Sequence, residues 1–307
     1  MLEKVKANKG YILLAITLII FLVSSVYIVK MHSSERTPRE PVNLNEIEKS
    51  RTITSDRVEE LFINASSANV HVTTAETDNF TINYTEHDFL RYQFIHEDNR
   101  FTVNQTQRFN TLVNSMNLVY TIEIIAPKNQ EFYLNIRTSN GYITVENFQA
   151  NGMELVTSNN PITITDTINT YATRLRTTNA AVNVTNFDTT VLNLTTSNNP
   201  VTLINTKAER IHVRNVNAPV TIRDIEATDI SLITSNFPVT GTIIGFYDRF
   251  NKDIVTSNGT ISIDNKAFGT ILNTGNDQTQ PLVVYTTHAN ISINFREPVL
   301  SPTTDED

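Results

Sequence analysis

The second half of this chain repeats a short motif about every 20 residues. Copies such as Val156–Ile164 (VTSNNPITI) and Thr195–Leu203 (TTSNNPVTL) align on a central Asn. Seven residues share this position, with spacings of 19, 20, 19, 19, 19 and 22: Asn140, Asn159, Asn179, Asn198, Asn217, Asn236 and Asn258. A weaker copy, Thr286–Ile293, should end the array, and Ala65–Val72 looks like an outlying copy before it. Helical repeats run to 33 residues or more, so this period predicts strands.

Each copy contains two short strands separated by a turn, with apolar residues alternating on the second strand. Stacking the copies in parallel would bury Ile162 and Ile164 beneath Val182 and Val184. The sequence therefore predicts an all-β fold, a parallel β-solenoid of about eight 19–20-residue rungs, preceded by a β-hairpin-rich N-terminal region. A β-sandwich is the alternative, because hairpins every ten residues also suit it, but sandwich strands seldom repeat their sequence.

Stacking would create two polar ladders. The turn Asn residues should form one, because Asn tolerates a left-handed backbone and bonds to its equivalent in the next rung. The other would point outward from the second strands: Thr144, Thr163, Asn183, Thr202, Thr221, Thr240 and Ser262. We interpret the first ladder as structural. The second is either a solvated face or a candidate binding face for a polymer, a glycan or ice. The neighbouring outward column is mixed, which argues against ice.

An uncharged stretch of 19 residues lies near the N-terminus, at 11–29. As a helix it would cover about 28 Å, close to the ~30 Å hydrocarbon layer of a membrane. We predict an uncleaved signal-anchor, with a cleaved signal peptide as the alternative. Lys4, Lys6 and Lys9 favour a cytoplasmic N-terminus, but three basic residues follow the stretch (Lys30, Arg36 and Arg39), so local charge alone does not decide the orientation. The large, polar, strand-rich C-terminal body indicates ordinary export with the N-terminus inside. The expected location is the cell membrane, single-pass, with the C-terminal domain extracytoplasmic.

The expected domain organisation follows from these features. It is a cytoplasmic tail (1–10), a transmembrane helix (11–29), a linker (30–57), an N-terminal β region (58–127), the β-solenoid repeats (128–296) and a disordered acidic tail (297–307). The net charge is −8, and residues 41–307 hold 18 basic and 29 acidic residues. This balance argues against a nucleic-acid partner.

The sequence offers little chemistry. The absence of Cys removes thiol nucleophiles and Cys-ligated zinc. The six His residues show no metal-binding spacing, and nucleotide-binding motifs are absent. Asp224, Glu226 and Asp229 form either a plain acidic turn or a set of oxygens for calcium. No carboxylate pair stands out for glycan hydrolysis. We therefore expect no catalytic residues, no metal and no cofactor.

The layout resembles the bacterial putative-adhesin domain family over about residues 58–296. The resemblance rests on Leu61–Ile63 with Ala65–Val72, on Ile122–Pro127, and on serial turns such as Thr138–Val145 and Thr256–Ile263. It implies a surface or envelope β-solenoid protein without a settled activity, similar to membrane-anchored, envelope-stress-associated members from Gram-positive bacteria. The chain departs from the usual turn Gly at five positions: Asn160, Asn199, Ala180, Ala218 and Phe237.

Three classes of function fit the sequence. The leading hypothesis is a non-enzymatic, membrane-anchored envelope protein whose solenoid binds a cell-wall polymer or an envelope protein. A variant of it acts in envelope-stress signalling through a membrane partner. The alternatives are a glycan-processing enzyme on a β-solenoid scaffold, which a concave acidic cleft away from the ladders would favour, and a purely structural spacer.

Overall fold

A computed structural model describes residues 47–54, 58–86, 90–107, 120–128, 130–275 and 280–298. The chain divides into two units, 1–44 and 45–307. The expected transmembrane helix at 11–29 lies outside the described residues. Within the described ranges, no helix is long and apolar enough to cross a membrane.

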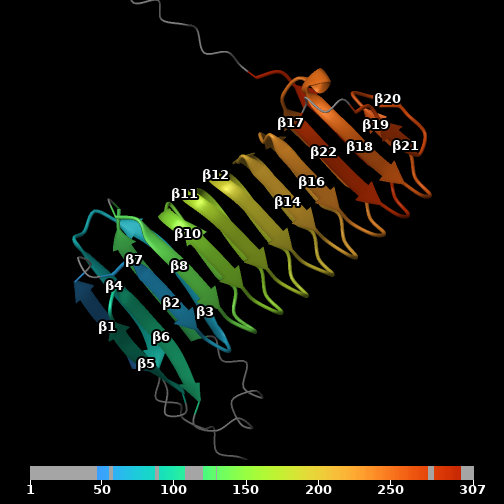
Figure 1. The fold of residues 1–307 in the computed structure, drawn as a ribbon. Helices are drawn as coiled ribbons and strands as arrows, with labels where there is room; N and C mark the ends of the chain where they lie inside the picture. Colours follow the sequence, from blue (N-terminus) through green and yellow to red (C-terminus); the bar gives the residue numbers. More distant parts are fainter. Residues whose placement is uncertain are drawn as a thin grey trace, which may run out of the picture. The chain divides into compact units, whose positions relative to one another are not determined.

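The described residues are almost entirely β-strand, and the strands stack in two ladders (Figure 1). Ladder A runs in this spatial order: β5 (Leu90–Glu97), β6 (Arg100–Gln107), β2 (Glu60–Asn64), β8 (Phe132–Arg137), β10 (Gln149–Val156), the second half of β11 (Ile162–Arg176), the second half of β12 (Val182–Thr195), β14 (Arg210–Arg214), β16 (Asp229–Ile233), β22 (Gln280–Thr286), β18 (Phe250–Thr256) and β21 (Ile271–Asn273).

Ladder B supplies the other strand of each rung. Its spatial order is β1 (Ile47–Thr54), β4 (Asn79–Glu86), β7 (Tyr120–Pro127), β3 (Ala68–Ala75), β9 (Ile143–Glu146), the first halves of β11 and β12, β13 (Val201–Lys207), β15 (Val220–Ile225), β17 (Val239–Ile244), β23 (Ile291–Arg296), β19 (Ile261–Ile263) and β20 (Lys266–Ala267). The 3₁₀ turn η2 (Tyr247–Arg249) joins β17 to β18.

The register confirms the predicted solenoid-like stacking of the repeats. Ile162 pairs with Val182 and Ile164 with Val184, and the parallel pairing continues from β12 through β13 and β15 to β17. These inward side chains are fully buried. Burying an aliphatic side chain stabilises a fold by about 1.5–3 kcal/mol. Because each rung buries its apolar residues against the next, the two ladders share one continuous core.

The Thr that opens each Thr-Ser-Asn turn is buried at the corner between the two ladders. Thr157 donates its hydroxyl to the carbonyl of Gly141 at 3.0 Å, and Thr196 donates to Ala180 at 3.2 Å. The same arrangement recurs at Thr234, which donates to Ala218 at 3.0 Å. Each hydroxyl thus satisfies a backbone carbonyl of the preceding rung, which explains why the repeat keeps Thr at a buried corner.

The spatial order of the rungs departs from the sequence order at the C-terminal end. Strands β22 and β23 lie between the rung of β16 and β17 and the rung of β18 and β19, as Figure 1 shows for β16, β22 and β18. The expectation that Thr286–Ile293 ends the array is therefore wrong, and the copy around Asn258 is outermost. The short antiparallel strands β20 and β21 cover that outermost rung, and the chain then returns to fill the gap.

The N-terminal end has a matching exchange. Strand β2 pairs with β6 on one side and β8 on the other, while β3 pairs with β7 and β9. The first rung of the sequence is therefore an interior rung of the stack. The proposed boundary between 127 and 128 stays a prediction, and β2 and β3 contact strands on both sides of it.

Amide hydrogen exchange tests this exchanged order. The amides of Leu282–Val284 and Ile291–Ile293 should be protected as strongly as those of Ile211–Val213 in the middle of the stack, because strands flank them on both sides. A rung at a free end would fray, with an opening free energy near zero. Fast exchange in β22 and β23, with slow exchange in β18 and β19, would contradict the observed order.

Candidate functional site

The predicted outward ladder forms one aligned column on ladder B, which we call the hydroxyl column. Thr163 pairs with Thr144 and with Asn183, and Thr221 pairs with Thr202 and with Thr240. Ser292 of β23 lies between Thr240 and Ser262. Sequence reasoning missed Ser292 because it took the order of the repeats as their order in space.

The side chains of the hydroxyl column point to solvent and are not used by the fold. Asn183 and Thr221 are exposed, and the others are half-buried by their neighbours. Within the described part of the chain, none of the eight makes a side-chain hydrogen bond. Hydroxyl groups both donate and accept, so the column can offer weak contacts at each rung, about 4.8 Å apart.

The regular polar surface is narrow. The next outward column contains Glu146, Thr165, Thr185 and Ile204 in register, so charge and apolar groups replace the hydroxyls. Toward the N-terminal end, His71 takes the place of Thr in the hydroxyl column. Its Nε2 lies 3.4 Å from a carboxylate oxygen of Glu146. The hydroxyl column is therefore a single row of polar side chains, and the neighbouring columns mix polar, charged and apolar residues.

The turn Asn residues form the predicted hydrogen-bonded ladder. Each side-chain amide donates to the Oδ1 of the Asn one rung earlier, at 2.8 Å for Asn159 to Asn140 and 3.0 Å for Asn179 to Asn159. The donor–acceptor distances are 2.9 Å for Asn198, 3.2 Å for Asn217 and 3.2 Å for Asn236. All five bonds run in one direction, so Asn159, Asn179, Asn198 and Asn217 each donate one bond and accept another.

The ladder stops short of Asn258. The Oδ1 of Asn236 lies 3.4 Å from the hydroxyl of Thr287, which donates to it. Asn258 instead donates its backbone amide to the carbonyl of Thr287 at 3.0 Å. The inserted strands β22 and β23 bring Thr287 between the two Asn residues, so the sequence-based pairing of Asn236 with Asn258 is wrong.

The left-handed residues are a different set from the one predicted. They follow the second strand of each rung: Asn147, Asp166, Asn186, Asn205 and Asp224, with φ between 47° and 56°. Asn186 donates to Asp166 at 2.7 Å, and Asn205 donates to Asn186 at 3.0 Å. The turn Asn residues are absent from the positive-φ residues of the described chain. These five residues each stand three positions after an outward residue of the second strand (144, 163, 183, 202 and 221), and this recurrence was the available sequence signal.

Two of the five departures from Gly in the turns, Asn160 and Asn199, have a structural explanation. A Cβ at Gly141 would lie 1.7 Å from the carbonyl oxygen of Ala68, so this turn requires glycine. In later turns, Asn160 and Asn199 donate their side-chain amides to the carbonyls of Asn140 and Asn179. These Asn residues add a second bond between rungs where the turn leaves room for a side chain.

A groove of about 500 Å³ lies on the opposite corner from the Asn ladder. Its walls include the carboxylates of Asp188, Glu209 and Glu226 and the cations of Lys207 and Arg249. All three carboxylates are exposed, and Glu226 lies 3.4 Å from the Lys207 ammonium. Glycosidases need one carboxylic acid held in an apolar setting beside a second carboxylate. The groove does not provide that setting.

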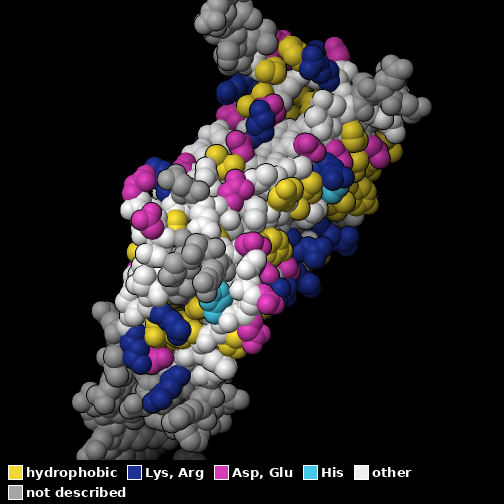
Figure 2. Space-filling model, turned by 60° about the vertical axis from the view of Figure 1, so that its left-hand side comes forward, with side chains coloured by type: hydrophobic (Ala, Val, Ile, Leu, Met, Phe, Trp, Pro, Cys, Tyr) yellow, Lys and Arg dark blue, Asp and Glu magenta, His cyan; other side chains and the backbone are white. Residues whose placement is uncertain are grey.

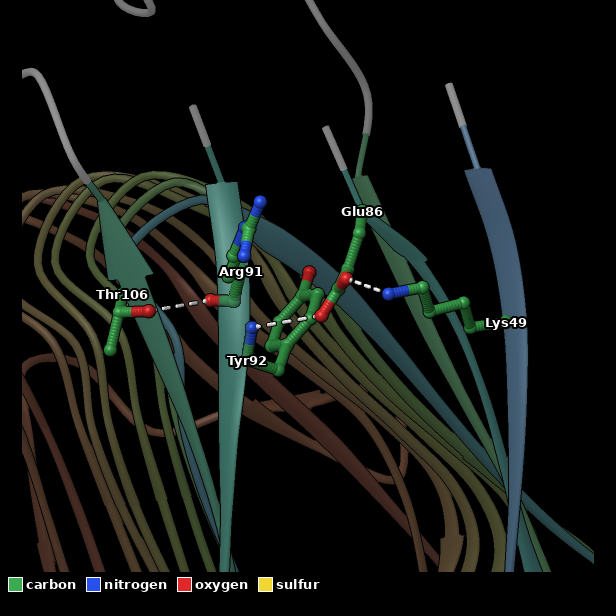
Figure 3. Close-up of polar contacts among 5 residues, drawn as sticks. All are labelled: Lys49, Glu86, Arg91, Tyr92 and Thr106. Carbon is green, nitrogen blue, oxygen red and sulfur yellow. Dashed lines mark hydrogen bonds and ion pairs between the residues drawn. The ribbon is translucent and has the colours of Figure 1, made fainter. Parts of the chain in front are cut away.

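The N-terminal end of the body contains a half-buried ion pair (Figure 3). The carboxylate of Glu86 accepts from the ammonium of Lys49 and, at 3.4 Å, from the backbone amide of Tyr92. Burial, with the nearby Tyr120 and Glu86, raises the pKa of the Tyr92 phenol well above its usual range. Glu86 thus joins β1, β4 and β5, and we interpret the group as structural.

The acidic run at 224–229 does not converge. Asp224 bonds to Arg296 at 3.2 Å, Glu226 pairs with Lys207, and Asp229 lies 3.3 Å from the imidazole of His212. Among the described residues, no group of three or more His, Asp or Glu could hold a metal ion.

The family of this chain follows from a match over most of its length. The model of the Toastrack DUF4097 family matches residues 58–294, so the chain belongs to that family. This agrees with the resemblance to putative-adhesin domains. No curated protein matches the chain.

Several solved structures match the chain at low identity and low TM-score. A putative adhesin from Bacteroides fragilis is 9% identical, with a TM-score of 0.45 and coverage of 81% of this chain and 97% of that one. A putative adhesin from Parabacteroides merdae is 11% identical (TM-score 0.40; 80% and 95% covered). A putative lipid binding protein from Parabacteroides distasonis is 12% identical (TM-score 0.39; 81% and 96% covered). Similarities at this level carry no conclusion about what this chain binds.

The Asn ladder should contribute measurably to stability. Asn198→Ala removes one donated and one accepted amide bond, and we expect the free energy of unfolding in urea to fall by about 1 kcal/mol. Asn183→Ala is the matched control, because Asn183 is exposed and makes no side-chain hydrogen bond in the described chain. Equal losses in the two variants would show that the ladder bonds do not stabilise the stack.

Proposed function

We propose that this chain is a non-enzymatic cell-envelope protein whose β-solenoid binds a repeating polymer through the hydroxyl column. The observation that carries the proposal is the column itself: eight aligned polar side chains on successive rungs, none bonded within the described protein. A periodic ligand such as a cell-wall glycan could meet a similar contact at every rung. Many weak contacts along a rigid row then add to a useful affinity.

The adhesin-like reading draws support from the family. The chain belongs to the Toastrack DUF4097 family, and its resemblance to putative-adhesin domains implies a surface or envelope protein. The groove beside Glu226 is the feature closest to the enzyme alternative. Its carboxylates are exposed and lie among cations, so we favour binding over catalysis.

Binding to cell walls is the first test. A fragment of residues 41–307 keeps every described core residue, because all of them lie within 58–293. We expect this fragment to co-sediment with isolated bacterial cell walls at physiological salt. Thr163→Val, Thr202→Val and Thr221→Val combined should weaken retention at least tenfold, since three hydroxyl contacts of ~0.5–1.5 kcal/mol each are lost.

Two further results decide the interpretation. The triple Lys variant at the same positions should also lose retention, and its urea midpoint, measured in parallel, shows whether the fold is retained. Equal retention by either triple variant would contradict the hydroxyl column as the binding face. If the unmodified fragment is not retained although its β-spectrum is normal, a protein partner at the membrane becomes the better proposal.

We further propose that residues 11–29 anchor the chain as a single span, with the N-terminus cytoplasmic and the solenoid extracytoplasmic. The uncharged stretch and the preceding lysines support this arrangement. The full chain should remain in the membrane pellet after alkaline washing, and external protease should digest the solenoid on cells stripped of wall. Release of a shortened, soluble chain would favour a cleaved signal peptide.

A further inference from the structure

One outward column on ladder A carries positive charge, although the protein as a whole is acidic. The register aligns nine residues across neighbouring strands, and we call them the arginine–apolar column: Arg137, Val156, Arg176, Thr195, Arg214, Ile233, Tyr285, Val255 and Ile271. The column has no carboxylate, although the chain carries a net charge of −8. Its first part is basic and its last part is apolar.

Two arginines at the centre of the column have no counter-charge. Arg176 and Arg214 are exposed, and neither forms an ion pair within the described residues. Their neighbours across the strands are Val156, Thr195 and Ile233, all uncharged. The two arginines lie two rungs apart, about 10 Å, so both guanidinium groups can engage neighbouring anionic groups.

Two more arginines flank this pair. Arg174 and Arg210 are exposed and also lack an ion pair within the described residues. Each lies across from a carboxylate that the structure bonds elsewhere. Glu154 bonds to Arg137 at 2.8 Å, and Asp229 lies 3.3 Å from the imidazole of His212. The local charge of this face therefore favours an anionic partner.

The last four positions of the column form an exposed apolar strip. Ile233, Tyr285, Val255 and Ile271 lie on four consecutive strands, and Tyr285 and Ile271 are 39% and 65% exposed. The ladder A strands at the front of Figure 1 turn to the right-hand margin of Figure 2, where dark blue and yellow side chains lie next to one another. Exposed apolar groups that continue a basic cluster typically mark an interaction surface.

We infer that the arginine–apolar column docks onto the surface of an anionic lipid bilayer. Arginine matches the oxygen geometry of lipid phosphates, and Tyr and Ile suit the boundary between headgroups and acyl chains. A water-soluble polyanion would use the arginines but would gain nothing from the apolar strip. The column lies on the sheet opposite the hydroxyl column, so the inference does not rest on the proposed function.

Vesicle binding tests the inference. The 41–307 fragment lacks residues 11–29, so its binding reports on the folded body alone. We expect it to co-sediment with vesicles of phosphatidylglycerol and phosphatidylcholine, but not with phosphatidylcholine alone. Arg176→Gln with Arg214→Gln should weaken binding about 30-fold, because each basic residue near such a surface contributes ~1 kcal/mol. Arg223→Gln with Lys266→Gln removes the same charge from exposed positions of ladder B and should have little effect.

The apolar strip separates a bilayer from a soluble polyanion. Ile271→Ser with Tyr285→Ser should weaken vesicle binding several-fold while retention on immobilised inorganic polyphosphate stays unchanged. If these substitutions leave vesicle binding intact, the arginine–apolar column binds through its charge alone and the lipid inference fails. Absence of binding to the anionic vesicles, or an equal loss in the ladder B control, would also overturn it. Thermal unfolding of each variant confirms that the fold is retained.

Discussion

Parallel, in-register pairing between rungs is the constraint on which the rest of this structure depends. Backbone hydrogen bonds hold residues 19 or 20 positions apart at one strand spacing, so a residue type repeated at that period becomes a continuous column. Ile and Val become the core, Thr fills the buried corner, Asn links the turns, and Thr on the outer face forms an unbonded row. One geometric rule therefore produces both the stability and the surfaces.

The columns differ in whether the fold uses their polar groups. The side-chain amides of the turn Asn residues are hydrogen-bonded to one another, so their exposure does not make them available to a ligand. The hydroxyl column, half-buried at most positions, has no such internal partner in the described chain. Arg176 and Arg214 are likewise unpaired on the other sheet. Accessibility together with unsatisfied bonding capacity, rather than exposure alone, separates the candidate surfaces from the structural ladders.

The sequence predicted which residues of successive repeats pair with one another, because the repeat period controls this pairing. It did not predict the spatial order of the rungs at the ends of the stack. Pairing of Ile162 with Val182 and of Thr202 with Thr221 followed from alignment, because parallel strands keep equivalent residues together. The place of Ser292 did not follow, because the exchange of rungs depends on connections that carry no repeat signal. The place of Tyr285 beside Ile233 depends on the same exchange, and Ile271 joins the column by antiparallel pairing with Val255, which the repeat does not predict.

The exchanged rungs have a consequence for the order in which the strands can assemble. Among the described strands, β18 and β19 find parallel neighbours only in β22 and β23, which follow them in the chain. A chain that ends near residue 275 would leave the rung of β16 and β17 open and the following rung undocked. Completion of the stack thus waits for strands whose residues lie 30 positions beyond their partners in β18 and β19. The open edge of a truncated product would present unpaired backbone groups to other chains and to proteases.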